Sequence, residues 1–180
     1  MNKIILFCVA MLCLFGCGKG TDQQTGDFNE TKPGISGYIV SKEGGRILVV
    51  SSEPKDFSDT GGQKEFYEAV FVSNVQQEVK IGQKVSVWFD GPILESFPAQ
   101  AKAKNISVFP SKKPDGADLS ESEVIRMALE KLDQSKEIIP AIKAVSYDEK
   151  SDTWDVLIKD TMFENKEYQV QVKDRQLKNQ

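Results

Sequence analysis

Residues 35–50, ISGYIVSKEGGRILVV, decide the fold of this chain. Residues 35–40 are rich in β-forming side chains, and residues 46–50 form an almost unbroken apolar run. Gly44 and Gly45 lie between these two segments, and glycine supplies the backbone conformations that a tight hairpin turn requires. The stretch therefore predicts two strands joined by a hairpin at the start of a β-rich region.

Three further apolar segments continue this pattern toward the C-terminus. A long polar excursion, residues 51–64, precedes the first of them, and Asp90-Gly91-Pro92 ends the second. Five short strands in about 75 residues predict a small antiparallel barrel over residues 34–109, similar to the OB-fold. A sandwich of the same strands is the alternative that the pattern leaves open. The three segments are residues 65–73, which we expect to begin with a helical turn, residues 85–89 and residues 101–108.

Two stretches of this region resemble a known family. They are residues 35–73, ISGYIVSKEGGRILVVSSEPKDFSDTGGQKEFYEAVFVS, and residues 81–108, IGQKVSVWFDGPILESFPAQAKAKNISV. Together they resemble the domain of YobA-like lipoproteins of Gram-positive, spore-forming bacteria, with RILVVSS and KVSVWFDGP as the most distinctive segments. That family is a domain of unknown function. The resemblance implies a barrel and an extracytoplasmic location, but no activity and no catalytic residues.

The C-terminal part of the chain changes from a strand pattern to a helical one. Residues 110–117 contain two prolines and a glycine and are expected to be a linker. Ser120 and Glu123 match a capping box, and apolar residues follow at helical spacing until the helix ends before Pro140. Three strands, the first two joined by a hairpin, complete an expected α+β domain over residues 118–175, similar in element order to PepSY-like modules. These strands are expected at residues 141–147, 153–158 and 168–173.

The N-terminal residues have the layout of a secretory signal peptide. Lys3 precedes an apolar run, residues 4–14, which is too short to span a bilayer as a mature helix. Gly16 and Cys17 follow, with leucine three places before the cysteine, and this resembles the lipobox of bacterial lipoproteins. The resemblance implies cleavage before Cys17, a diacylglyceryl group on its thiol and, in some bacteria, acylation of its amine.

We therefore expect residues 1–16 to be a lipoprotein signal peptide. Residues 17–33 are expected to be the lipidated Cys17 and a flexible tether, because they are almost entirely polar or glycine. The alternative is a soluble secreted protein cut near Gly16 or Gly18, in which Cys17 has no role.

The composition excludes several classes of chemistry. The chain contains no histidine, and its three cysteines, Cys8, Cys13 and Cys17, all precede residue 18. Ser-His-Asp hydrolysis, thiol chemistry and the usual zinc sites are thereby excluded. Carboxylate-only catalysis, a Ser-Lys pair and calcium on oxygen ligands are left, and none shows its expected local pattern. We expect no catalytic residue, no cofactor and no metal, and the formal net charge of −4 disfavours nucleic acid as a partner.

Seven aromatic side chains lie in the first folded region, and we expect most of them in the barrel core. Trp88 is the aromatic most favoured for a binding role, with Tyr67 next, whereas Trp154 is expected in the core of the second domain. The glycine loop at residues 58–62 and the acidic run at residues 148–152 are expected to be a mobile loop and a solvated turn, not anion or calcium sites. The seven aromatics are Phe57, Phe66, Tyr67, Phe71, Trp88, Phe89 and Phe97.

These observations predict a non-catalytic binding or interaction module of the cell envelope. It would be anchored by the lipid on Cys17 to the extracytoplasmic face of the bacterial cell membrane, with an envelope protein as its expected partner. The first alternative is a lipoprotein that binds a small ligand or a wall fragment. The second is a surface enzyme that uses carboxylates alone.

Overall fold

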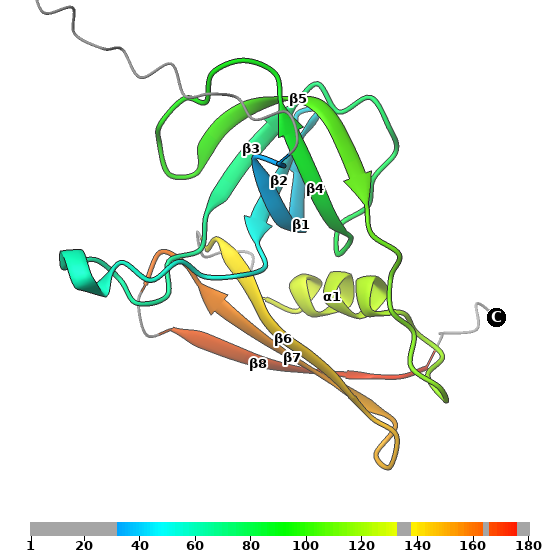
Figure 1. Cartoon of the computed structure of the whole chain (residues 1–180). Coiled ribbons are helices and arrows are strands. Elements are labelled where there is room, and N and C mark those ends of the chain that lie inside the picture. Colours follow the sequence, from blue (N-terminus) through cyan, green and yellow to red (C-terminus); the bar gives the residue numbers. More distant parts are fainter. Residues whose placement is uncertain (1–31, 133–137, 164–165, 176–180) are drawn as a thin grey trace, which may run out of the picture.

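In the computed structural model, the chain is mainly β and forms a closed five-stranded barrel followed by one helix and a three-stranded sheet (Figure 1). The structure describes residues 32–132, 138–163 and 166–175, so the expected signal peptide and Cys17 lie outside the described residues. The barrel strands are β1 (Ile35–Glu43), β2 (Arg46–Ser51), β3 (Ala69–Ser73), β4 (Lys84–Phe89) and β5 (Ala99–Val108), with a short 3₁₀ helix η1 (Ser58–Thr60) after β2. The other elements are α1 (Glu121–Glu130), β6 (Pro140–Asp148), β7 (Thr153–Asp160) and β8 (Glu167–Lys173).

The β1–β2 hairpin has the turn that the two glycines predict. Gly44 and Gly45 have φ angles of 56° and 77°, and Glu43 pairs with Arg46 across the turn. Positive φ at both central residues is the geometry of a type I′ turn, whose twist matches that of the flanking strands.

The barrel closes because β4 pairs with β1, giving the order β1-β2-β3-β5-β4. The expected purely antiparallel barrel is wrong at one place: β3 and β5 run parallel, with Val70 opposite Ala99 and Val72 opposite Ala101. The reason is one of parity. In a closed ring of five strands the direction cannot alternate at every contact, so one neighbouring pair must be parallel.

The barrel interior is filled by small and β-branched side chains. Ile39, Val49, Val72, Val85 and Val87 have no solvent exposure. Alternation along β4 places Val85 and Val87 inside, while Ser86 lies on the other face and bonds Ser36 Oγ at 2.6 Å. A barrel of five strands has room for little more than such side chains. Of the aromatics expected in its core, half-buried Phe89 packs against this cluster, whereas Tyr67 and Phe71 belong to the cluster that contains α1.

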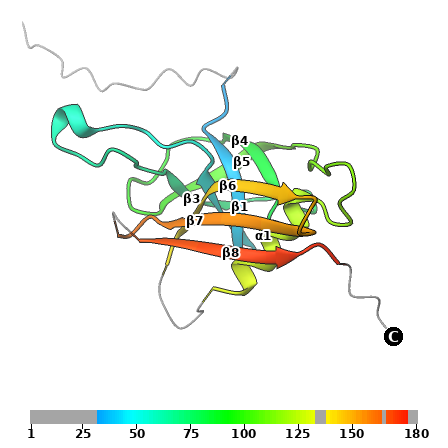
Figure 2. The ribbon, with the colours of Figure 1, turned by 90° about the horizontal axis from the view of Figure 1, so that it is seen from below.

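The α+β unit has the local structure that the sequence predicts. The Glu123 carboxylate accepts the Ser120 amide at 2.8 Å, which is the carboxylate half of the capping box. The Ser120 hydroxyl also donates to this carboxylate at 2.6 Å. Helix α1 ends at Glu130, earlier than the expected end, and residues 133–137 lie outside the described part of the chain. The sheet has the order β6-β7-β8 (Figure 2). Trp154 of β7 is buried in the cluster that contains the helix residues, as expected. Within the described ranges, no helix combines the length and apolarity needed to cross a membrane.

The barrel and the α+β unit share one apolar core. Figure 1 shows α1 and β6 between the barrel and the rest of the sheet. On β2, Ile47 and Val49 point into the barrel, whereas Leu48 and Val50 belong to the cluster that contains α1 and the sheet. The unbroken apolar run of β2 follows from this arrangement, because both faces of the strand are buried. The other members of the shared core include Val40, Tyr67, Ala69, Val124, Ile125, Ala128, Leu129, Ile142, Trp154, Val156 and Ile158.

The connection expected as a linker is held to both units by hydrogen bonds. The Phe109 amide donates to the Lys84 carbonyl at 2.9 Å, and the Glu121 amide donates to the Lys112 carbonyl at 2.8 Å. The Ser122 amide donates to Ser111 Oγ at 2.9 Å. The first turn of α1 is therefore capped by the connection itself.

Gly82→Ala should weaken the contact between the barrel and α1. A Cβ at this position would lie 2.1 Å from the Ser122 carbonyl oxygen, and the residue has a φ of +90°. Gly45→Ala is the matched control, since Gly45 has a φ of +77° and nothing within 4 Å of the added Cβ. We expect the control to lower the free energy of unfolding by about 1–2 kcal/mol from backbone strain, and Gly82→Ala to lower it by about 2 kcal/mol more from the clash. Urea unfolding measures the free energy of unfolding of both variants. An equal decrease for Gly82→Ala and Gly45→Ala would contradict the predicted clash with α1.

Candidate functional site

Two loops at one end of the barrel form an exposed apolar patch. Residues 52–68 connect β2 to β3, and residues 90–98 connect β4 to β5. We define the apolar patch as Phe57 and Phe66 from the first loop with Ile93 and Phe97 from the second. The Phe66 ring lies between its neighbours, with its centroid 5.6 Å from that of Phe57 and 5.8 Å from that of Phe97. Phe57, Ile93 and Phe97 each keep 41% of their surface exposed, which is high for side chains of this size.

Backbone hydrogen bonds hold the first loop in shape. Lys55 and Phe66 exchange bonds of 2.8 and 2.9 Å, so the helical turn expected after Lys64 is replaced by an extended pair. The Phe57 amide donates to the Gln63 carbonyl at 2.9 Å, and a Cβ on Gly62 would lie 2.8 Å from Phe57 Cβ. The position of the Phe57 side chain is therefore set by the backbone around it.

The second loop is held in the same manner. Leu94 and Gln100 exchange backbone bonds of 2.9 and 3.1 Å, which folds the loop back onto the start of β5. Ser96 Oγ donates to the Pro98 carbonyl at 2.7 Å. A cavity of about 230 Å³ lies beside the patch, and its wall includes Gly34, at the start of the described fold.

The two loops are strongly acidic. They carry seven carboxylates and two lysines, Lys55 and Lys64, whereas the whole chain has a formal net charge of −4. Lys55 already pairs with Glu68 at 2.6 Å. Hydrogen bonds from Ser58 hold the pKa of the Asp56 carboxyl below its ordinary value, so this exposed group stays charged at neutral pH. The carboxylates are Glu53, Asp56, Asp59, Glu65, Glu68, Asp90 and Glu95.

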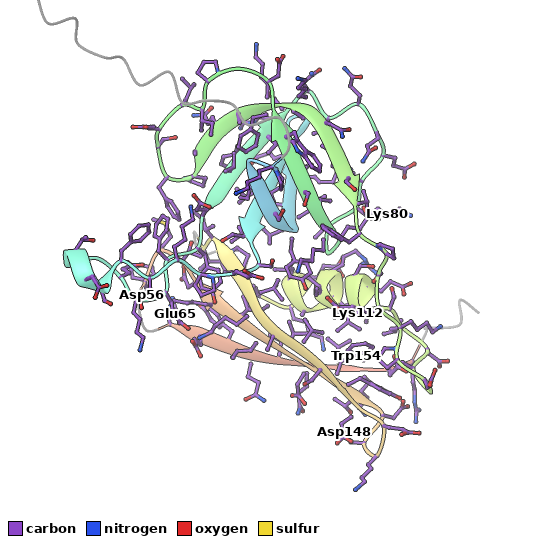
Figure 3. All side chains as sticks on the ribbon, in the orientation of Figure 1. Asp56, Glu65, Lys80, Lys112, Asp148 and Trp154 are labelled. Atoms are coloured by element: carbon purple, nitrogen blue, oxygen red, sulfur yellow. The ribbon has the colours of Figure 1, made fainter. Side chains whose placement is uncertain are left out.

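An ion cluster ties the first loop to the sheet (Figure 3). Glu65 Oε2 lies 3.0 Å from Lys143 Nζ and 3.1 Å from Lys159 Nζ, and Lys143 also reaches Glu167 at 2.7 Å. Hydrogen bonds from the two lysines lower the pKa of Glu65, and the bond to Glu167 raises the pKa of Lys143. The next residue but one, Tyr67, is buried in the shared core. Phe66 therefore lies between two residues whose side chains are held in place, Glu65 by the ion cluster and Tyr67 by the shared core.

A larger groove lies between the barrel, the connection to α1 and the helix N-terminus. Its volume is about 710 Å³. Tyr38 crosses it and donates from its hydroxyl to Glu121 Oε1 at 2.7 Å, and Lys84 Nζ lies 5.6 Å from the centre of the Tyr38 ring. Burial and the bond to Glu121 raise the pKa of Tyr38. The walls mix lysines, carboxylates and serines, with Phe109 as an exposed apolar group.

Asp174 is a buried carboxylate with a structural set of partners. It is 1% exposed and accepts hydrogen bonds from Trp154 Nε1 at 2.9 Å, the Leu119 amide at 2.8 Å and the Asp118 amide. Burial alone raises the pKa of Asp174, but these three bonds outweigh it and hold the pKa below its ordinary value. The Asp174 carboxylate therefore connects the end of β8 both to β7, through Trp154, and to the segment before α1, through the two backbone amides.

The residues singled out from the sequence have different environments. Trp88 is half-buried, and Tyr67, the second aromatic considered for binding, is buried in the shared core. Residues 58–62 form an exposed 3₁₀ turn, and residues 148–152 form the β6–β7 hairpin turn, with Asp148 capping its own turn. No three residues of the metal-ligating types come together among the residues that the structure describes.

Sequence reasoning missed the exposure of Phe57 and Phe97. Both were counted with the aromatics expected to fill the core. The only local signal was their position beside turn residues, Gly61-Gly62 in one case and Pro98 in the other.

Comparison with known proteins identifies one domain. Residues 36–110 match the model of a family described as "Protein of unknown function (DUF3221)". The match covers the barrel and ends at the start of the connection to α1. Neither the curated proteins nor the solved structures include a significant match to this chain.

Asp174→Asn should destabilise the fold in a pH-dependent way. The amide would place N–H groups against buried donors, at a cost of about 2–4 kcal/mol in the free energy of unfolding at pH 7. Because the folded pKa of Asp174 is depressed, its contribution is present above the unfolded pKa and is lost as the pH falls through the folded pKa, so the difference from wild type should shrink below about pH 4. Asp155→Asn, on the outer face of the sheet, is the control. Urea unfolding at pH 7 and pH 3 measures the free energy of unfolding of each variant. An equal loss for Asp174→Asn at the two pH values would contradict the assignment.

Proposed function

We propose that this chain is a non-catalytic interaction module of the bacterial cell envelope. A lipid on Cys17 holds it at the extracytoplasmic face of the membrane, and the apolar patch is its binding surface. The observation that carries the proposal is the patch itself: three large apolar side chains are exposed on loops whose backbone is already fixed.

Apolar surface gathered in one exposed patch is unfavourable for a protein in its unbound state. Exposed apolar groups gathered at one place are typical of interaction sites, whereas scattered ones are ordinary. Loops on a rigid scaffold are where binding residues concentrate, and buried aromatic anchors dominate the energetics of interfaces. Phe57, Phe66 and Phe97 fit this description because their rings contact one another across two loops.

The barrel topology supports an OB-like interpretation. The spatial order β4-β1-β2-β3 is that of a Greek key, and β5 completes the ring between β3 and β4. OB-folds bind ligands on the face of strands 2 and 3 and with the neighbouring loops. Here the outer face of β2 is covered by the α+β unit, and of the two patch loops the β4–β5 loop, which carries Ile93 and Phe97, corresponds to a binding loop of OB-folds.

The proposed envelope location is supported by the resemblance of the residues before Cys17 to a lipobox and by the resemblance of the barrel segments to YobA-like lipoproteins. Residues 18–32 would act as a coil of roughly 20 Å between the lipid and the fold. Gly34 lines the cavity beside the apolar patch, so the tether would enter next to the binding surface.

A second function, capture of a small ligand or wall fragment, is favoured by the groove that Tyr38 crosses. Its 710 Å³ lies within the range of small-molecule sites, roughly 300–1,000 Å³. Its walls offer hydroxyls, lysines and carboxylates together with an aromatic face, a set suited to a polar, uncharged ligand such as a saccharide.

Cys17→Ala should release the protein from the membrane fraction, because the acylated thiol is the anchor. The same variant should also escape cleavage before residue 17. Cys13→Ala is the matched control, since Cys13 lies within the same apolar run and should leave anchoring intact. Cell fractionation and the mass of the mature chain measure both effects. Normal processing and membrane retention of Cys17→Ala would refute the lipid anchor.

In-cell cross-linking followed by mass spectrometry tests the interaction. One envelope protein enriched with the tethered chain and depleted with Cys17→Ala is the expected result. If no protein is enriched over the untethered control, the small-ligand function becomes the better proposal.

A further inference from the structure

We propose that the apolar patch binds a cationic amphipathic segment of a partner protein. The apolar side chains of that segment would cover Phe57, Ile93 and Phe97, and its lysine or arginine side chains would meet the acidic loops. This inference rests on the proposed interaction function and names the chemistry of the partner.

The size of the patch favours side-chain anchors over a small ligand. The adjoining cavity of about 230 Å³ is smaller than the roughly 300 Å³ at which small-molecule sites begin. Its walls include Phe66, Phe89, Ile93 and Phe97, together with Glu95. An apolar side chain fits such a cavity, and aromatic walls of this kind are where interface anchors gain most of their binding energy.

The charge around the patch selects the partner. Asp56, Asp59 and Glu95 are exposed, and Asp90 and Glu53 add further negative charge on the same two loops. A second copy of the chain would bring like charges together at this face, and so would a membrane rich in anionic lipid. A segment with basic residues flanking its apolar face would gain from the same charges.

The loops are also prepared for binding. The hydrogen bonds at Phe57, Phe66 and Leu94 fix the backbone, and Glu65 is already paired with Lys143. The loops therefore lose little conformational entropy when a partner binds. Pre-organisation of this kind raises the affinity because it reduces the entropic cost of binding.

The test uses the full chain fixed to a biosensor surface through a C-terminal tag. The probe is a synthetic leucine–lysine peptide patterned as an amphipathic helix, and the matched probe carries glutamate in place of lysine. We expect the lysine peptide to bind, the glutamate peptide not to bind, and added salt to weaken binding. The double variant Phe57→Ser/Phe97→Ser should lose at least about tenfold in affinity.

Two further variants keep the test decisive. Met162→Ser is the apolar control, because Met162 is 50% exposed and lies in the β7–β8 turn, outside the two loops that form the patch. Glu95→Lys combined with Asp59→Lys should weaken lysine-peptide binding while leaving the aromatic rings in place, because both carboxylates are exposed. This variant covers the case in which the double serine variant unfolds. Circular dichroism establishes which variants are folded.

The outcomes that overturn the proposal are distinct. Equal binding of both peptides, or binding unaffected by the patch and charge variants, removes this surface as the site. Patch-dependent binding of phosphatidylglycerol vesicles would assign it to lipid, and patch-dependent binding of the chain to itself would assign it to a second copy. Membrane anchoring by Cys17 and partner enrichment in cells are measured separately, so failure of the cationic-segment proposal is distinguishable from failure of the envelope interaction function.

Discussion

The rest of the structure depends on the burial of β2 on both of its faces. Ile47 and Val49 close the barrel from inside, and Leu48 and Val50 carry the α+β unit from outside. At about 25 cal/mol per Å² of apolar surface, a strand buried on both faces contributes more than any other strand of its length. The groove, the fixed loops and the position of the apolar patch follow from this sandwiching, because it sets where the two units meet.

Two carboxylates reinforce that packing at opposite places in the chain. Asp174 joins the connection before α1 to the end of β8 through donors 55 and 56 residues away. Glu65 joins the β2–β3 loop to lysines 78 and 94 residues away. In a chain without histidine, and with cysteine confined to its first residues, charged groups provide the long-range polar fastening. They act where the apolar core ends and backbone donors would otherwise be buried alone.

Local chemistry could be predicted from the sequence, and long-range geometry could not. The Gly44-Gly45 turn and the Ser120 capping box depend on neighbours a few residues apart, and both predictions are confirmed. The parallel β3–β5 pair follows from counting strands once closure is known, but closure itself is a property of the whole ring. Residues 65–68 become extended only because Lys55 pairs with Phe66 from across the loop. The patch was missed for the same reason, since nothing near Phe97 in the sequence indicates that Phe66 will lie beside it.

The shared core also constrains which substitutions the two units tolerate. The family match ends near residue 110, yet the outer face of the matched barrel carries Val40, Leu48 and Val50, which belong to the core shared with the following residues. A barrel of this kind inherited without the α+β unit would leave those three side chains in water. A relative without the α+β unit would need polar residues at these positions or a different element that covers them. In a relative that keeps the unit, a larger side chain on β2 can be compensated by a smaller one on α1. Pairs of positions such as Leu48 and those facing it on the helix are then expected to vary together, as if the two units were one inherited element.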